Sequence, residues 1–154
     1  MKANEANDSE IAIRREREGD AEQLSGLFGQ LGYPGKTAAL AERLDRLRRH
    51  EDYSIFVAER DGILIGTIAL HRELPLLRDA CEAWITALVV SEEARGSGVG
   101  GRLLERAEEW AREQGAAYVR LNSGNREERR QAHLFYRGRG YAAGSTGFAK
   151  ALKQ

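Results

Sequence analysis

Residues 85–104 read ITALVVSEEARGSGVGGRLL. The first part, residues 85–90, is short, apolar and rich in β-branched side chains, which favours a buried strand over a helix. Behind the glycines, apolar residues recur at helical spacing and predict a helix over residues 98–114. These apolar residues are Val99, Leu103, Leu104, Ala107, Trp110 and Ala111. The stretch therefore predicts a strand, a glycine-rich turn and a helix in direct succession.

Alternate glycines mark the turn between this strand and this helix. Gly96, Gly98 and Gly100 remove every second Cβ, so that backbone N–H groups can point outward and approach a ligand closely. The turn also lies at the N-terminus of the predicted helix, where the helix dipole favours negative charge. We therefore predict an anion site here, and specifically a pyrophosphate site.

Three known patterns of phosphate-binding loop can be compared with this stretch. A P-loop needs Lys-Ser or Lys-Thr directly after its glycines, and the only Lys-Thr pair, Lys36-Thr37, lies far away. Gly96, Gly98 and Gly101 match the dinucleotide-binding pattern G-x-G-x-x-G. That pattern also requires a carboxylate about 20 residues further on, which binds the ribose. Residues 119–123 read VRLNS and contain no carboxylate. The third pattern, [RQ]-x-x-G-x-[GA], is matched by residues 95–100 directly after a strand, and it fits best.

Composition sets the broad class of the protein. The 154 residues suit one domain, and we expect a disordered leader over residues 1–10 followed by a single domain over residues 11–154. Basic and acidic residues balance at 24 each, so no global field argues for a nucleic-acid or membrane partner. Cys81 is alone, which rules out an intramolecular disulfide, and no His pair has metal spacing, so we predict no metal. A polar start and the lack of a membrane-length apolar run favour a cytoplasmic location.

The remaining elements are predicted from hydrophobic periodicity and turn residues. We expect further helices over residues 21–30, from residue 37, and over residues 126–139. Strands are expected over residues 11–14, 54–59, 63–70, 83–90 and 118–121, with a last hairpin formed by residues 141–143 and 148–152. The segment 29–35 is either a mobile lid or an ordinary loop between helices. In the helix from Thr37, we interpret Arg43, Arg46, Arg48 and Arg49 as a solvated face.

Two motifs give the chain a family resemblance that extends from Ile11 to Leu152. The 95–100 turn resembles the acetyl-CoA loop of the GNAT N-acetyltransferases, and residues 132–141, AHLFYRGRGY, resemble the family pattern A-x-x-[FL]-Y-x-x-x-G-[FY]. The resemblance implies an α/β fold, with a mixed central sheet of about six to seven strands flanked by about four helices. The C-terminal part is similar to a branch that acetylates small amines, including aminoalkylphosphonate-type acetyltransferases.

The resemblance also implies where acetyl-CoA would bind. Backbone groups of Leu88, Val89 and Val90 would pair with the pantetheine arm as an added strand. The amides of Arg95, Gly96, Ser97, Gly98, Val99 and Gly100 would hold the pyrophosphate. On the C-terminal side, His133 and Phe135 would lie beside the cofactor. Ser123, Asn125 or neither would contact pantetheine, because the spacing from Asn125 to Ala132 is longer than in the common family pattern.

The transfer chemistry needs a base, an oxyanion donor and an acid. The resemblance implies Tyr136 as the acid that protonates the leaving thiolate, since a phenol with a reference pKa of about 10 suits that group. Relatives often place a base near the position of Trp84, which is not an acid here. Glu82 lies two residues earlier on the same face of the strand and is our candidate base, acting through a water. His71 and His133 are the alternatives.

We therefore expect an N-acetyltransferase that moves the acetyl group of acetyl-CoA directly to a primary amine of a small molecule. A peptide or protein acetyltransferase is the alternative among enzymes. A CoA-binding regulatory module without turnover is the alternative of another class. The family resemblance also allows a homodimer.

Overall fold

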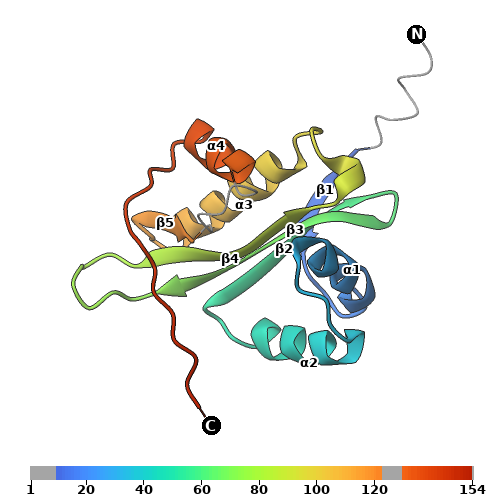
Figure 1. Cartoon of the computed structure of the whole chain (residues 1–154), viewed down its shortest axis with the longest axis horizontal. Helices are drawn as coiled ribbons and strands as arrows, with labels where there is room; N and C mark the ends of the chain where they lie inside the picture. The colour runs from blue at the N-terminus through green and yellow to red at the C-terminus, as the bar shows by residue number, and fades with distance from the viewer. Residues whose placement is uncertain (1–9, 123–129, 154) are drawn as a thin grey trace. The chain divides into compact units, whose positions relative to one another are not determined.

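The computed structural model describes residues 10–122 and 130–153 (Figure 1). The elements follow the order β1 (Ala12–Arg15), α1 (Ala21–Leu31), α2 (Thr37–Arg48), β2 (Tyr53–Arg60), β3 (Ile63–Glu73), β4 (Glu82–Val90), η2 (Glu92–Ala94), α3 (Val99–Glu113), β5 (Tyr118–Leu121) and α4 (Arg130–Gly138). The expected leader over residues 1–10 lies almost entirely outside the described residues. The chain divides into two compact units, one up to Arg120 and the other from Leu121, and each is described by itself.

The first unit is built on a sheet with the strand order β1-β2-β3-β4-β5. Strands β1 to β4 pair in antiparallel fashion, each with the next along the chain. Asp61 and Gly62 connect β2 to β3 with φ values of 53° and 79°, as a tight hairpin turn with two left-handed residues requires. Strand β5 follows β4 only after helix α3, and the result is the mixed α/β sheet that the sequence predicts.

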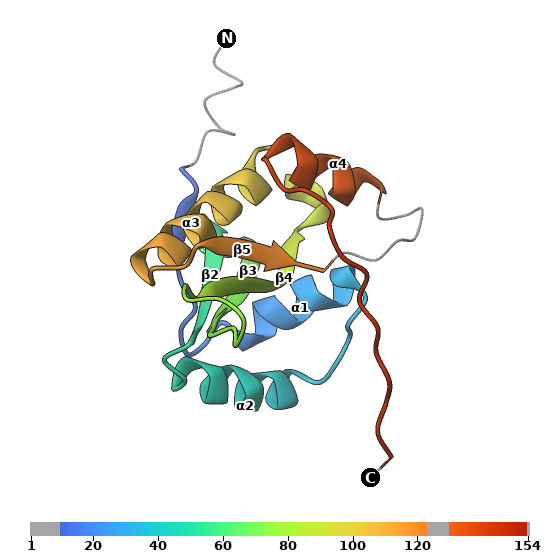
Figure 2. The same cartoon turned by 90° about the vertical axis from the view of Figure 1, so that its left-hand side faces the viewer.

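Helices cover both faces of this sheet (Figures 1 and 2). Helices α1 and α2 pack on one face, where Leu24, Leu27, Leu40 and Leu44 meet Ile55, Val57 and Val89 in one buried cluster. Helix α3 packs on the other face and buries Val99, Gly101, Leu103, Leu104, Ala107, Trp110 and Ala111. Strands β2 and β3 contribute side chains to the packing on both faces of the sheet, because neighbouring residues of a strand point to opposite faces.

The second unit contains helix α4, and here the expected strand count is wrong. No strand is assigned in residues 141–153, so the described chain has five strands where six to seven were expected. Residues 142–147 read AAGSTG, in which Ala and Gly have low β-propensity, and an isolated two-stranded hairpin is marginal at best in water. The four predicted helices are present, although residues 126–129 of the last one lie outside the described chain.

In the described part of the chain, no helix combines the length and the apolar character needed to cross a lipid bilayer.

Candidate functional site

Strand β4 carries an irregularity halfway along its length. Ala87 pairs with Ala69 of β3, but Ile85 pairs with the next residue, Leu70, so Thr86 is an extra residue in β4. The Thr86 hydroxyl donates to the Ala69 carbonyl over 3.2 Å. Such a bulge bends and twists its strand. It therefore gives the end of β4, where Leu88, Val89 and Val90 lie, a different direction from its start.

The end of β4 extends beyond its neighbour β5. The Ala117 N–H donates to the Cys81 carbonyl over 2.9 Å, which places the start of β5 beside the start of β4. Strand β5 has four residues and β4 has nine. Four residues span only about 13 Å at 3.3 Å per residue, so β5 ends before it reaches Leu88–Val90. Backbone groups on that edge of β4 are therefore not paired by β5 and can accept an added strand.

The glycine-rich turn follows directly. Gly96 and Gly98 have φ values of 81° and 84°, in the left-handed region that favours glycine. A Cβ added at either position would meet no atom within 4 Å, so both glycines face open space. Two hydrogen bonds stabilise the turn, because both the amide and the hydroxyl of Ser97 donate to the Ala94 carbonyl.

Helix α3 begins at Val99 with Gly98 as its N-cap, and no side chain caps it. The first internal bond of the helix runs from the Arg102 N–H to the Gly98 carbonyl. The amides of Gly98, Val99, Gly100 and Gly101 therefore belong to the first turn, whose N–H groups have no partner inside a helix. The Arg95 side chain is exposed and makes no ion pair within the described chain. These donors at the positive end of the helix dipole can hold a polyanion.

A close approach between β3 and α3 holds this helix end in place. A Cβ on Gly66 would come within 3.0 Å of Leu103 Cδ1 and within 3.1 Å of both the Val89 carbonyl oxygen and Val99 Cγ1. Glycine at residue 66 therefore lets the first turn of α3 lie directly on β3 and β4 without displacing these neighbours. The start of α3 thus packs tightly against the end of β4.

The candidate base Glu82 lies at the start of β4 between two arginines. Its side chain is 7% exposed, and its oxygens accept from Arg78 Nη1 over 3.1 Å and from Arg120 Nε over 2.9 Å. Both arginines also lie over the Tyr118 ring. This cluster ties the start of β4 to β5. One acceptor position on each carboxylate oxygen is thus occupied, and a water would have to use the others.

Two buried nitrogens belong to residues that are paired across β3 and β4. His71 of β3 is paired in register with Trp84 of β4. Within the described chain, His71 Nδ1 and Trp84 Nε1 are buried and have no hydrogen-bond partner. Buried polar atoms without partners are rare in folded proteins, and each needs an explanation such as a bound ligand or water.

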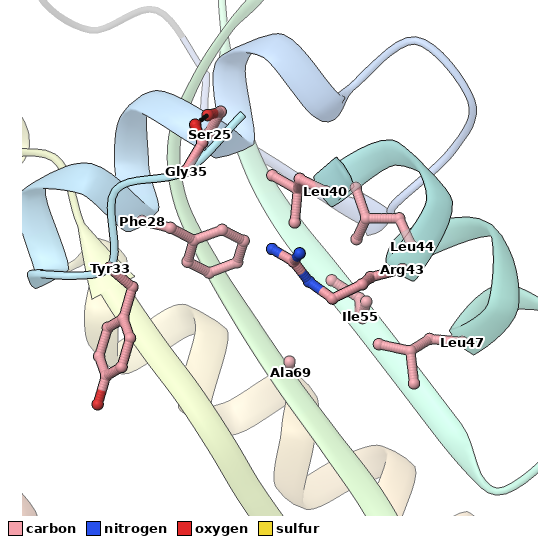
Figure 3. A pocket seen from close by; sticks show the side chains of 10 residues that line it. All are labelled: Ser25, Phe28, Tyr33, Gly35, Leu40, Arg43, Leu44, Leu47, Ile55 and Ala69. Atoms are coloured by element: carbon pink, nitrogen blue, oxygen red, sulfur yellow. Dashed lines mark hydrogen bonds between the residues drawn. The ribbon is translucent and has the colours of Figure 1, made fainter. Parts of the chain in front are cut away.

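The α1–α2 face of the sheet contains a cavity of about 210 Å³ where α1 and α2 diverge over the sheet (Figure 3). It is lined by Ser25, Phe28, Tyr33, Gly35, Leu40, Arg43, Leu44, Leu47, Ile55 and Ala69. Tyr33 and Gly35 come from the 29–35 connection, so that segment is part of the cavity wall, and whether it is mobile stays a prediction.

Arg43 is exposed, as the interpretation of a solvated basic face expects, but it also lines the cavity. Figure 3 shows its guanidinium over the cavity, toward Phe28 and above Ala69. Arg48 and Arg49 of the same helix instead form ion pairs, both with Asp45 and the former also with Glu16. The sequence does contain the signal for Arg43, since Leu40, Arg43 and Leu47 follow the i, i+3, i+7 spacing of one helix face.

In the second unit, a helix cap fixes the position of Tyr136. Gly140 has a φ of 89°, its N–H donates to the Arg137 carbonyl, and the Tyr141 N–H donates to the Tyr136 carbonyl over 3.0 Å. These two bonds are the Schellman motif that ends many helices. The Tyr136 ring contacts the Phe135 and Tyr141 rings edge to face, at 5.3 Å and 5.9 Å between centroids. The pattern Y-x-x-x-G-[FY] is therefore a helix ending that orients a tyrosine.

The other predicted residues of the second unit are placed as follows. His133 and Phe135 lie in α4, and Arg139 stacks over the Phe135 ring. Ser123 and Asn125 lie outside the described residues. Among the residues that the structure describes, no three His, Cys, Asp or Glu side chains form a group that could hold a metal ion.

Known proteins share both the sequence pattern and the fold. Residues 21–141 match the model of the acetyltransferase (GNAT) family. The chain is 38% identical over 96 residues to an aminoalkylphosphonate N-acetyltransferase of Salmonella typhimurium, over 62% of this chain and 61% of that protein. It therefore spans about three fifths of the length of this curated relative.

Solved structures give the same assignment. A GNAT family acetyltransferase of Staphylococcus aureus is 30% identical, with a TM-score of 0.79 over 92% of this chain and 98% of that one. The aminoglycoside N-acetyltransferase AAC(6')-Iy, solved in complex with CoA, shares the fold at 17% identity, with a TM-score of 0.82 over 95% of this chain and 97% of that one. On this evidence the chain belongs to the acetyltransferase (GNAT) family.

Proposed function

We propose that the protein is an N-acetyltransferase that transfers the acetyl group of acetyl-CoA directly to the primary amine of a small molecule. The observation that carries the proposal is the glycine turn of Arg95–Gly100 at the start of α3, directly after the edge of β4 that β5 does not reach. The turn offers backbone donors for a pyrophosphate, and the edge offers an added strand to the amide-containing pantetheine arm. Family membership and the names of the relatives support the same cofactor and reaction.

The bulge at Thr86 supports the position of the reacting carbonyl. We infer that the acetyl group lies near this irregularity, where a backbone N–H left outside the ladder can stabilise the oxyanion. The neutral amine attacks the thioester carbonyl carbon, so that a C–N bond forms and the C–S bond breaks. The attacking nitrogen loses one proton to a base, and the departing thiolate takes one proton from an acid.

We assign the acid to Tyr136, because the helix ending at Gly140 holds its ring between Phe135 and Tyr141. For the base we keep Glu82 acting through a water, with His71 as the alternative. Glu82 has the weaker geometric support, since each of its oxygens already accepts from an arginine. His71 has an unused buried nitrogen one strand from β4. We also propose that Leu88, Val89, Val90, Ser123, Asn125, His133 and Phe135 contact the cofactor.

The cavity on the α1–α2 face supports a small acceptor. Its volume of about 210 Å³ is enough for a small amine. Its floor residue Ala69 is paired with Ala87 of β4, so the cavity lies one strand from the proposed position of the thioester. The cytoplasmic location and the homodimer stay predictions.

Thiol release from acetyl-CoA tests the proposal, measured on a panel of small primary amines and peptides. We expect release that depends on a small amine. Cofactor binding without release on any amine would contradict the enzyme assignment and favour a binding module, and release only with peptides would contradict the small-molecule assignment.

Tyr136→Phe tests the acid. We expect kcat to fall about 100-fold, as for loss of a general acid, while the Kd for acetyl-CoA changes much less. Tyr118→Phe removes the same hydroxyl from an exposed ring and serves as the matched control. Equal losses of kcat and cofactor affinity in Tyr136→Phe would contradict the assignment.

A further inference from the structure

We infer that the cavity between α1 and α2 selects amines that also carry an anionic group, with Arg43 as the residue that binds that group. The inference rests on the proposed function, because it names the class of acceptor for the same site. The class consists of primary amines joined by a short aliphatic linker to a carboxylate, phosphonate or phosphate.

The charge of Arg43 is uncompensated within the described chain. Three other arginines near α1 and α2, Arg14, Arg48 and Arg49, each form ion pairs with carboxylates. Arg43 forms none, and none of the residues that line the cavity is an Asp or Glu. A fixed positive charge over a cavity without a counter-ion attracts an anionic ligand and repels a second ammonium group.

The surroundings of Arg43 strengthen this preference. Most of the remaining wall is apolar and consists of Phe28, Leu40, Leu44, Leu47, Ile55 and Ala69. Arg43 itself is exposed, so these side chains shield a charge pair at its guanidinium from water only on the side of the cavity. The planar guanidinium also presents paired N–H donors that match a carboxylate or a phosphonate in two parallel bonds.

The position of the cavity limits the length of the acceptor. Ala69 on its floor is paired with Ala87, and Ile68 with Leu88, so the proposed thioester position is one strand away, about 5 Å. An amine that reaches β4 while its anionic end contacts Arg43 therefore needs only a short linker. The cavity volume of about 210 Å³ fits such a molecule.

The test compares four short amines that differ mainly in their second group: aminoethylphosphonate, β-alanine, neutral β-alaninamide and the diamine propanediamine. We measure kcat/KM by thiol release, and binding of aminoethylphosphonate by calorimetry. We expect at least one of the two anionic amines to exceed the neutral amide about tenfold or more, and the diamine to be poorest. In Arg43→Gln, the ratio of anionic to neutral amine falls about 10- to 100-fold, the range expected for lost charge-assisted bonds. Arg43→Lys keeps the positive charge but loses the paired N–H donors of the guanidinium, and we expect an intermediate ratio of anionic to neutral amine.

Arg46→Gln is the matched control, because Arg46 lies on the same helix, is exposed and does not line the cavity. It keeps the ratio of the parent protein. An unchanged ratio in Arg43→Gln, or a preference of the parent for the diamine or the amide, overturns the inference while turnover upholds the proposed function. If no amine is turned over but aminoethylphosphonate binding still depends on Arg43, the proposed function fails and the anion site stands.

Discussion

The two faces of the central sheet are packed in different ways. On the α3 face, seven residues of one helix are buried against the strands, and Gly66 allows an approach in which an added Cβ would be crowded by its neighbours. On the α1–α2 face, two helices diverge and leave a cavity under an arginine. At the start of α3, the α3 face offers the backbone N–H groups of the glycine turn to a ligand. The α1–α2 face instead offers the side chains that line the cavity. We propose that the α3 face binds the cofactor and that the α1–α2 face selects the acceptor.

The largest effect is expected at the turn on the α3 face, from Gly98→Glu. A carboxylate at residue 98 would face the cofactor pyrophosphate, and facing like charges cost several kcal/mol. We expect the Kd for acetyl-CoA, measured by calorimetry, to rise at least about 100-fold, which corresponds to about 2.7 kcal/mol.

The control at this position is Gly98→Asn. Asn tolerates the positive φ of residue 98 better than other side chains and adds no charge. It should weaken binding much less than Glu does. Equal effects of the two substitutions would show that backbone strain, and not charge, explains the loss.

A smaller effect is expected from Gly66→Ala, which tests the tight packing of the α3 face. The added methyl would meet Leu103, Val99 and the Val89 carbonyl at 3.0–3.1 Å. Overpacking of this kind destabilises by about 1–3 kcal/mol, which chemical denaturation would measure.

The matched substitution on the other face is Gly26→Ala in α1. Gly26 is exposed, and a Cβ there meets nothing within 4 Å. Replacing a helical glycine by alanine should stabilise by up to about 1 kcal/mol. If both substitutions change the free energy of unfolding in the same direction, the contrast between the two faces is wrong.

The smallest effect concerns the ion pairs that anchor α1. Burial raises the pKa of the Asp20 carboxyl, but hydrogen bonds from the Arg14 side chain and the Arg17 amide outweigh it, so the pKa is lowered from 3.8. A lowered pKa in the folded state adds stability above the unfolded pKa, and this stability is lost as the pH falls through the folded pKa. We expect Asp20→Asn to cost about 1 kcal/mol at pH 7, as for a partly exposed pair, and the cost to shrink below pH 4.

Thermal unfolding measured between pH 2 and pH 7 would check the Asp20 prediction. Asp79→Asn is the control, since Asp79 is exposed and has no ion pair within the described chain. A cost for Asp20→Asn that did not vary with pH would mean that the charge of Asp20 contributes nothing.

The sequence predicts the α3 face and its turn well, because the signals there are local. Glycine at residues 96 and 98 reports a backbone conformation directly, and the 3.6-residue period of α3 reports its buried stripe. The Gly140 helix ending was recognised as a motif in the same way. The predicted contacts of these residues with a cofactor stay predictions.

Features that depend on residues far apart in the chain could not be predicted. The bulge at Thr86 arises from the register between β3 and β4, and the arginine partners of Glu82 come from a loop and from β5. The cavity needs α1, α2, β2 and β3 together, so the sequence could not show that Arg43, one of four exposed arginines in and directly after α2, also lines it. The expected C-terminal hairpin failed for the same reason, since strand pairing is decided by partners and not by local pattern.

The most direct test of the central claim, that amides of the turn hold the cofactor pyrophosphate, is an NMR titration of isotope-labelled protein. CoA is compared with pantetheine, which lacks the diphosphate. We predict that the amide resonances of Gly96, Ser97, Gly98, Val99 and Gly100 shift with CoA and stay in place with pantetheine. Shifts confined to other parts of the chain, or equal shifts with both ligands, would contradict the account.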